Sequence, residues 1–325
     1  MDHYSPRTFP KHSAMTLWPA WMKGLTPEMA LIARTELGET PEKRAEALKE
    51  LKILIKEEKS KGFCPLEDDE FLIRFLRARK YDVDRAFTTL RNYYTFRSEY
   101  SGVITDLTPR DLKRVLELEH VFVSPKRAPE GEGLLFVFIG SLDFNVVTLD
   151  EIFAAGIIGA EVGMETEATQ VCGCHIILDM HGMSWRKFKH FVKPSFLRCF
   201  ATCIQDVLPI RIKAIHAVNQ PVYFNIAFNT IKPFLSEKIT NRVHLHGDDF
   251  KSLHEHIPPE ALPEKLDGHL GQKDFQDFKT MMIQNTPLIE RINTYTYNGV
   301  QSKQACKVQE NSNVTTRKLF KVLNK

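Results

Sequence analysis

Five basic side chains stand out between residues 209 and 247, because the same stretch holds a single acidic residue. The basic residues are Arg211, Lys213, Lys232, Lys238 and Arg242, and the acidic residue is Glu237. Five minus one gives a local charge of +4, in a chain whose total formal charge is +3. The planar fork of arginine can hold two phosphate oxygens, so phosphate binding is the chemistry that this cluster suggests. A solvated charged surface is the competing interpretation.

The spacing of these cations brings them together in pairs. In a strand through residues 210–213, Arg211 and Lys213 alternate with isoleucines, so both cations lie on one face. Lys238 and Arg242 are four residues apart, so a helix that continues this far places them side by side.

A very apolar segment, PVYFNIAFNTIKPFL at residues 221–235, separates the two pairs of cations. Its apolar residues recur at helical spacing; they are Phe224, Ala227, Phe228, Ile231, Phe234 and Leu235. On periodicity alone, an ordinary helix that faces the core explains this pattern.

Other motifs give no sign of catalysis or of a metal. Gly156, Gly159 and Gly163 match neither a dinucleotide-binding loop nor a P-loop, and no GxSxG motif is present. Four cysteines, Cys172, Cys174, Cys199 and Cys203, do not have the usual zinc spacing. We therefore predict no enzyme activity, no cofactor and no metal site.

Several polar residues of the expected sheet are interpreted as structural. Asp179 ends the strand HIILD, but no nucleophile or second carboxylate pairs with it in the sequence, so we expect a hydrogen-bonding role. His216, His244 and His246 are likewise expected to pack or to form hydrogen bonds. Arg74 and Arg77 are expected either to bind phosphate or to pair with acidic residues nearby.

The elements that must position these residues fall into two parts. Good helix formers and proline-containing helix starts fill residues 26–105. From about Gly131, apolar strands alternate with helices, which is typical of a mostly parallel sheet covered by helices. We predict a poorly ordered N-terminus (1–25), a helical domain (26–105), an α/β domain (106–285) and a C-terminal tail (286–325).

Composition limits the class of protein. No stretch approaches about 18 uninterrupted apolar residues, and the first residues lack the apolar region of a secretory signal. A cytoplasmic protein is therefore expected, with its six cysteines as free thiols. The small net charge gives no indication of nucleic acid as a partner.

Three segments resemble one known family. FLIRFLRARKYDVDRA (71–86), ILDMHG (177–182) and VNQPVYFNIAFNTIKPFLSEKI (218–239) are similar to the CRAL-TRIO lipid-binding family, within the group of alpha-tocopherol transfer protein, cellular retinaldehyde-binding protein and clavesins. The resemblance runs from about residue 25 to residue 278. It implies a helical N-terminal domain followed by an α/β domain, whose sheet floors an apolar cavity closed by a helical gate. The segment 221–235 corresponds to that gate.

The resemblance also assigns roles to individual residues. Basic residues at the matching positions bind a phosphoinositide headgroup; here these are Arg79, Arg211, Lys213, Lys238 and Arg242. Positions along the hydrophobic ligand pocket are Phe153, Gly156, Ile157, Ala160, Leu178, Phe200, Cys203, Ile204, Ile210, Ile212 and Ile215. The tocopherol protein has serines at the positions of Gly156 and Ala160, so this pocket is expected to be roomier and less polar.

The function implied by the resemblance is intracellular binding and transfer of a hydrophobic small molecule, with docking on phosphoinositide-containing membranes such as endosomes. Retinoids, tocopherol-like molecules and other lipids all remain open as cargo. A lipid-sensing regulator of membrane traffic without net transport is the first alternative, and an enzyme acting on a lipid is the second.

Overall fold

The computed structural model describes residues 17–224, 228–229 and 232–297. Four helices form the N-terminal part. They are α1 (Pro27–Leu37), α2 (Pro41–Glu58), α3 (Asp69–Ala78) and α4 (Val83–Glu99), with the 3-10 turn η1 (Lys59–Lys61) after α2. Thr26 and Thr40 cap α1 and α2, since their hydroxyls accept hydrogen bonds from the backbone N–H groups of Met29 and Lys43. Both helix starts lie where the Thr-Pro-Glu motifs predict them.

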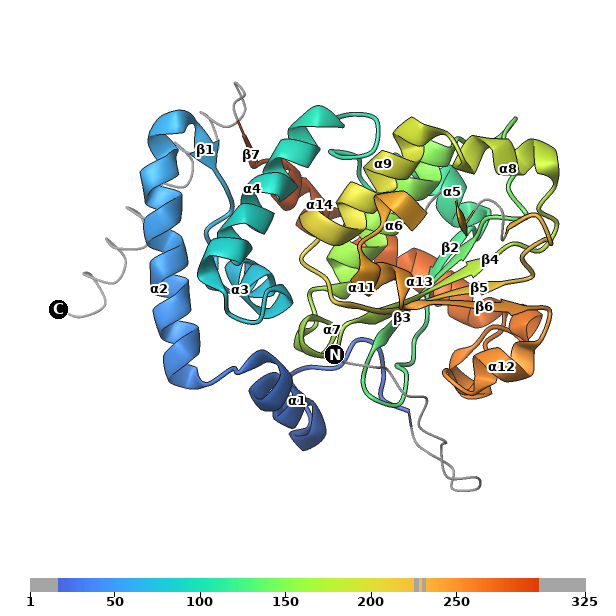
Figure 1. Ribbon diagram of the computed structural model, residues 1–325, viewed down its shortest axis with the longest axis horizontal. Coiled ribbons are helices and arrows are strands. Elements are labelled where there is room, and N and C mark those ends of the chain that lie inside the picture. The colour runs from blue at the N-terminus through green and yellow to red at the C-terminus, as the bar shows by residue number, and fades with distance from the viewer. Residues whose placement is uncertain (1–16, 225–227, 230–231, 298–325) are drawn as a thin grey trace.

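A five-stranded sheet forms the α/β part (Figure 1). Its strands are β2 (Val121–Val123), β3 (Gly133–Phe138), β4 (Cys174–Asp179), β5 (Ile212–Val218) and β6 (Val243–Gly247), and they lie in that order. The pairs β3–β4, β4–β5 and β5–β6 are parallel, whereas β2 pairs with β3 in the antiparallel sense. The predicted fold class, a helical N-terminal domain followed by an α/β domain with a mostly parallel sheet, is confirmed.

Helices cover the two faces of this sheet. The elements along the chain are α5 (Lys113–Glu117), α6 (Leu149–Gly163), α7 (Glu167–Cys172), α8 (Trp185–Phe191), α9 (Pro194–Thr202), the π-helix η2 (Cys203–Val207), α11 (Glu237–Thr240), α12 (Phe250–His254), α13 (Gln272–Gln284) and α14 (Thr286–Asn293). Short 3-10 turns are η3 (Lys232–Phe234), η4 (Pro259–Ala261) and η5 (Glu264–Leu266). A capping box at Thr148 and Glu151 starts α6.

Strand register sorts the side chains onto two faces. Leu135 pairs with Ile176, which pairs with Ile215, so these residues share one face. The next row, Phe136 and Ile177, points to the opposite face. There, the aromatic rings of β2, β3 and α13 make a dense layer, in which Phe122 and Phe275 stack with centroids 4.2 Å apart.

The end of the described chain returns to the N-terminal helices (Figure 1). Residues 286–297, assigned to a tail by the sequence analysis, form α14 and β7 (Thr296–Tyr297). Strand β7 pairs in the antiparallel sense with β1 (Phe63–Cys64). Helix α14 buries Ile289 and Ile292. The remaining predicted tail, residues 298–325, and the predicted poorly ordered residues 1–16 lie outside the described residues.

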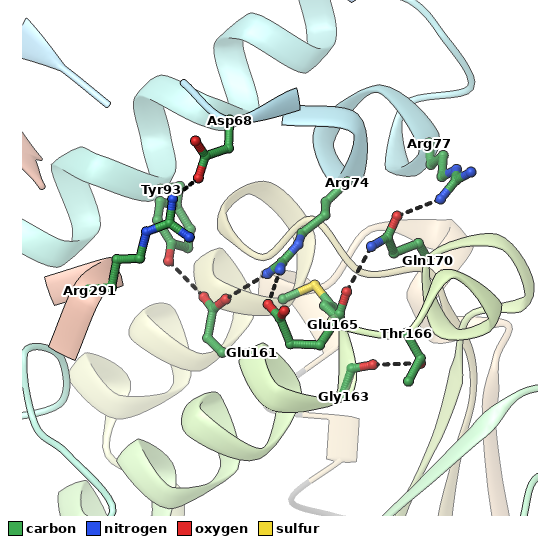
Figure 2. A network of polar contacts seen from close by, with 11 residues as sticks. Asp68, Arg74, Arg77, Tyr93, Glu161, Gly163, Glu165, Thr166, Gln170 and Arg291 are labelled. Atoms are coloured by element: carbon green, nitrogen blue, oxygen red, sulfur yellow. Dashed lines mark hydrogen bonds and ion pairs between the residues drawn. The ribbon is translucent and has the colours of Figure 1, made fainter. Parts of the chain in front are cut away.

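A buried polar network joins the N-terminal helices to the α/β part (Figure 2). The Arg74 guanidinium of α3 lies 3.6 Å from a carboxylate oxygen of Glu161 in α6, and it also pairs with Glu165. Tyr93 of α4 donates a 2.7 Å hydrogen bond to Glu161. Arg74 and Glu161 are only 4% and 2% exposed, so removing one partner would leave a buried charge uncompensated, at a cost of about 3–5 kcal/mol.

Arg77 makes a second set of contacts in the same interface. Its guanidinium donates to Glu39 at 2.8 and 2.9 Å, to Glu167 at 3.0 Å and to Gln170 at 2.7 Å. Burial alone lowers the pKa of Arg77, but the two carboxylates raise it above its ordinary value on balance. Of the two roles open for Arg74 and Arg77, the structure shows the pairing with acidic residues.

Candidate functional site

An apolar cavity of about 210 Å³ lies between the sheet and the helices α6, α8 and α9. The sheet contributes the face that carries Leu135, Ile176 and Leu178. Aromatic side chains supply much of the opposite wall; they are Phe153, Phe188, Phe191, Phe196 and Phe200. Apolar walls of this kind suit a water-excluding site for a hydrophobic molecule.

Nine of the eleven residues predicted to line a pocket lie in the wall of this cavity. They are Phe153, Gly156, Ile157, Ala160, Leu178, Phe200, Ile204, Ile210 and Ile212. Contact of these residues with a ligand stays a prediction. The space beside Gly156 is open, since a Cβ added there would meet no atom within 4 Å.

Two predicted pocket residues lie elsewhere in the core. Cys203 is fully buried in η2, which packs against α4, and it is not in the cavity wall. Ile215 lies on the cavity face of the sheet and packs in a cluster with Ile176, Ile204 and Ile212, which line the cavity, but it is not itself in the cavity wall. Contact of these two side chains with a ligand stays a prediction.

The sequence analysis missed the polar end of the cavity. Arg127 is 1% exposed, and its guanidinium donates to three backbone carbonyls and to the hydroxyls of Thr166 and Thr169. Burial lowers the pKa of Arg127 to about 10. No simple motif marks this residue, because four of its five partners lie far away in the sequence. The aromatic side of the cavity formed by α8 and α9 does have a signal in the sequence, because its phenylalanines recur at helical spacing.

The segment 221–235 borders the cavity at its described residues. Phe224 is buried and lies in the cavity wall, and its ring centroid is 6.3 Å from that of Phe228. Phe234 and Leu235 are half-buried. Ala227 and Ile231, also predicted for the apolar side of a gate, lie outside the described residues. The role of this segment as a gate stays a prediction.

The predicted phosphate-binding cations gather at the amino ends of β5 and β6. Arg211 directly precedes β5 and Lys213 lies within it, and both contact the carboxylate of Glu36 in α1, at 2.5 and 3.3 Å. Arg242 precedes β6 and donates to the backbone carbonyl of Ile212. The pattern of alternation in the sequence correctly places Arg211 and Lys213 together, but it gave no sign of Glu36.

Lys238 lies among the other cations of this site. Burial lowers the pKa of Lys238, and the charges of Arg242, Lys80, Arg211 and Arg79 lower it further, in that order. Four positive neighbours around one ammonium group make an attractive site for an anion. Lys80 was not among the five predicted phosphoinositide-binding residues. The only indication of it in the sequence is its position next to Arg79.

Arg79 connects this site to the segment 221–235. Its guanidinium donates a 2.9 Å hydrogen bond to the backbone carbonyl of Gln205 in η2. The side chain of Gln205 in turn donates to the Phe234 carbonyl at 3.1 Å and accepts from the backbone N–H of Ser236. One residue of a π-helix therefore touches both the cation site and the end of the apolar segment, and π-helical turns occur frequently at functional sites.

Asp179, another polar residue singled out in the sequence, has a structural role. Asp179 accepts hydrogen bonds from the His181 backbone and the Asn219 side chain, as predicted. Among the described residues, no group of three or more His, Cys, Asp or Glu could hold a metal ion. No described helix has the length and apolar character to cross a membrane.

The predicted state of the cysteines is confirmed at four positions. Cys172, Cys174, Cys199 and Cys203 are free and buried. Cys64 is disulfide-bonded, so the prediction of a free thiol is wrong there.

Comparisons with known proteins identify the family and the fold. Residues 119–268 match the family described as CRAL/TRIO domain, and residues 47–92 match CRAL/TRIO, N-terminal domain. The chain is 37% identical over 265 residues to Alpha-tocopherol transfer protein-like of Mus musculus and of Homo sapiens, covering 82% of this chain and 77% of each relative. It is 31% identical over 286 residues to Clavesin-1 of Rattus norvegicus, covering 87% and 80%. The crystal structure of Sfh5 has the same fold, with a TM-score of 0.52 at 12% identity over 84% of this chain and 99% of that chain.

The open space beside Gly156 can be tested by filling it. We expect Gly156→Leu in the lipid-free protein to raise the free energy of unfolding by about 1 kcal/mol, since leucine is a better helix former and gains apolar contacts. Urea unfolding measures this change.

Gly159→Leu is the matched control in the same helix. A Cβ at Gly159 already meets Leu135 at 3.7 Å and Val123 at 3.8 Å, so the larger side chain is expected to overpack the core and cost about 1–3 kcal/mol. Equal destabilisation by both substitutions would show that the space at Gly156 is not open.

Proposed function

Because the chain belongs to the CRAL-TRIO family, whose members bind and transfer lipophilic ligands, we propose that it carries a hydrophobic small molecule between membranes. Cargo binds in the cavity, the five cations dock on phosphoinositide headgroups, and the segment 221–235 opens to exchange cargo. The protein acts as a carrier and not as an enzyme. The observation that carries this proposal is the apolar cavity beside residues that gather positive charge.

The shape and chemistry of the cavity support a largely apolar cargo. Its wall has no hydroxyl at Gly156 or Ala160, and its polar residues Arg127 and Thr169 already bond within the protein, where Arg127 donates to five oxygen partners. Binding would be driven by apolar area removed from water, at about 25 cal/mol per Å². Retinoids, tocopherol-like molecules and other lipids of this character are the proposed cargo class.

The cation site supports docking on an anionic headgroup. A phosphate that enters between Arg211 and Lys213 would replace the Glu36 carboxylate, which holds both cations in the absence of a headgroup. Such a phosphate would also come near Arg79, Lys238 and Arg242. The exchange of one anion for another leaves Arg211 and Lys213 in place, and charge-assisted hydrogen bonds to phosphate are strong.

Exposed apolar side chains near the start of the apolar segment support contact with a membrane. Val222 is 93% exposed and Trp185 of α8 is 54% exposed. The Trp185 ring packs edge-on against Tyr223, and the ammonium group of Lys189 lies 6.0 Å from it. Aromatic and cationic side chains of this kind are typical of a membrane–water interface.

The hydrogen bonds of Gln205 support a mechanism in which headgroup binding favours opening. A headgroup that draws Arg79 toward its phosphate weakens the Arg79–Gln205 contact, and Gln205 holds the end of the segment 221–235. Headgroup binding and cargo binding are then linked with opposite preference for the open state, so each lowers the affinity for the other. Reversible attachment to phosphoinositide-bearing membranes follows from this scheme.

A transfer assay between donor and acceptor vesicles tests the proposed function. We expect cargo transfer to be faster when the acceptor contains phosphoinositide. Lys238→Glu should weaken binding to these vesicles roughly tenfold and remove most of the acceleration, because it reverses a charge inside the cation site. Lys251→Glu makes the same change of charge on exposed α12 and should leave both measurements unchanged. Saturable cargo binding without transfer would instead identify a lipid sensor.

Gln205→Ala tests the link between the two sites. This variant should bind phosphoinositide vesicles as the original protein does, yet release its cargo at a rate that no longer depends on the headgroup. Gln276→Ala, an exposed glutamine of α13, is the control and should keep the dependence. Full headgroup dependence in Gln205→Ala would contradict this route of coupling.

A further inference from the structure

Five histidines lie together on the face of the sheet opposite the cavity. His216 of β5 and His244 of β6 are partners in register, the ring of His175 in β4 stacks on His216 with centroids 5.1 Å apart, and His246 and His256 complete the cluster. The six ring-centroid distances among His216, His244, His246 and His256 lie between 4.7 and 6.3 Å. His175, His216 and His246 are 1%, 0% and 7% exposed. None of the functions described above uses this cluster.

Three of these rings form a hydrogen-bonded chain. His175 Nδ1 lies 3.0 Å from His216 Nε2, and His216 Nδ1 lies 2.9 Å from His246 Nε2. The chain ends at the Ser252 hydroxyl of α12, 2.8 Å from His246 Nδ1. At the other end, His175 Nε2 lies 3.9 Å from the buried carboxylate of Glu132 and accepts or donates no hydrogen bond.

This geometry fits one proton on each ring. A neutral imidazole has one donor and one acceptor nitrogen, so three neutral rings can form every bond of the chain in a single direction. The Glu132 carboxylate selects the direction in which His175 turns its Nε2–H toward it. Ser252 then donates to His246, His246 donates to His216, and His216 donates to His175.

An added proton disrupts this arrangement. On His175 or His216, it would set two N–H groups against each other across a 3.0 or 2.9 Å contact, and one hydrogen bond would be lost. On His246, it would keep a bond to Ser252, but it would place a cation among the rings of His216, His244 and His256. Second and third protons on neighbouring rings would add repulsion between like charges.

Within the part of the chain that the structure describes, the electrostatic contacts of these rings include two carboxylates. Glu132 faces His175, but it is also near Lys213 and Arg127, and Asp249 faces His246 from the start of α12. His254 of α12 turns away, to the Leu266 carbonyl. Among these residues, two carboxylates face five histidines.

For His216, His244, His246 and His256, the pKa is lowered from its ordinary value. Burial is the largest cause in each case, and the neighbouring histidines add to it: the pKa falls to about 4 for His244 and for His246, and it falls below the ordinary value for His216 and His256. The pKa of a histidine in an unfolded or opened segment is about 6.5. The stabilisation from neutral rings is therefore complete above about pH 6.5 and is lost as the pH falls toward about 4.

The cluster lies where strand β6 and helix α12 attach to strand β5, so an added proton acts on this attachment. Strand β6 lies at the edge of the sheet and pairs with β5 alone (Figure 1). Helix α12 packs on β6 and β5 and holds the cluster through Ser252. Since the rings join β5 to β6 and α12, repulsion among them acts on the attachment of this edge.

We propose that the histidine cluster is a proton-responsive latch, whose protonation in mildly acidic surroundings releases strand β6 and helix α12 from strand β5. The latch works without any ligand. If the proposed carrier function also holds, acid would loosen the strand that Arg242 begins, and with it the cation site at the amino ends of β5 and β6.

Hydrogen exchange of the intact protein tests the latch, in buffers with EDTA at about pH 7 and about pH 5. After correction for the intrinsic exchange rate, the protection of β6 and α12 amides should fall on the order of tenfold for each histidine that titrates in the opened state. The far edge of the sheet, β2 with β3, is the internal control and should change much less. Equal loss of protection at both edges, or none at β6, would overturn the proposal.

A double substitution tests the role of the rings themselves. His244→Gln with His256→Gln removes two titrating rings and leaves the chain from His175 to Ser252 in place, so the acid-induced loss of protection in β6 should shrink at least tenfold. The control His181→Gln changes an exposed histidine outside the cluster and should keep the full loss. An unchanged response in the double variant would refute the latch. Should that variant fail to fold, the comparison of the two sheet edges in the unaltered chain decides the question.

Discussion

The rest of the structure depends on the apolar cavity, a chamber that the side chains of the core do not fill. Unfilled apolar space costs about 24 cal/mol per Å³ in a folded protein, so 210 Å³ would cost about 5 kcal/mol. This is comparable to the whole stability of many domains. A molecule that fills the chamber would recover this free energy, so the same feature that weakens the empty protein favours binding of an apolar ligand. The remaining architecture can be understood as support for the chamber.

Two polar networks provide that support without entering the apolar wall. Arg74, Glu161 and Tyr93 tie the N-terminal helices to α6, the helix that forms one side of the chamber. On the other side, Arg79 and Gln205 connect the cation site to the end of the segment 221–235. Buried charges with specific partners fix the relative positions of helices, whereas apolar contacts alone tolerate small shifts. Buried ion pairs therefore hold the side of the chamber formed by α6, and hydrogen bonds of Gln205 hold the side next to the segment 221–235.

The sequence predicted well those features that depend on local periodicity. The alternation of apolar strands and helices gave β3 to β6 in their correct positions, and Thr-Pro-Glu motifs gave the starts of α1 and α2. The sequence did not predict contacts between residues that are far apart along the chain. Glu36 binds Arg211 from 175 positions away, and the histidines align only when three strands take their register. Nine residues that the resemblance assigned to a pocket lie in the cavity wall, whereas Cys203 in η2 and Ile215 in β5 lie outside it.

Native mass spectrometry of the purified protein tests most directly whether the chamber holds a ligand. The protein would be expressed in cells, isolated without detergent and transferred intact into the gas phase. We predict a population with one bound apolar molecule, released unmodified when the protein is denatured. A protein that carries no such molecule, and takes up none from a mixture of cellular lipids, would contradict the account.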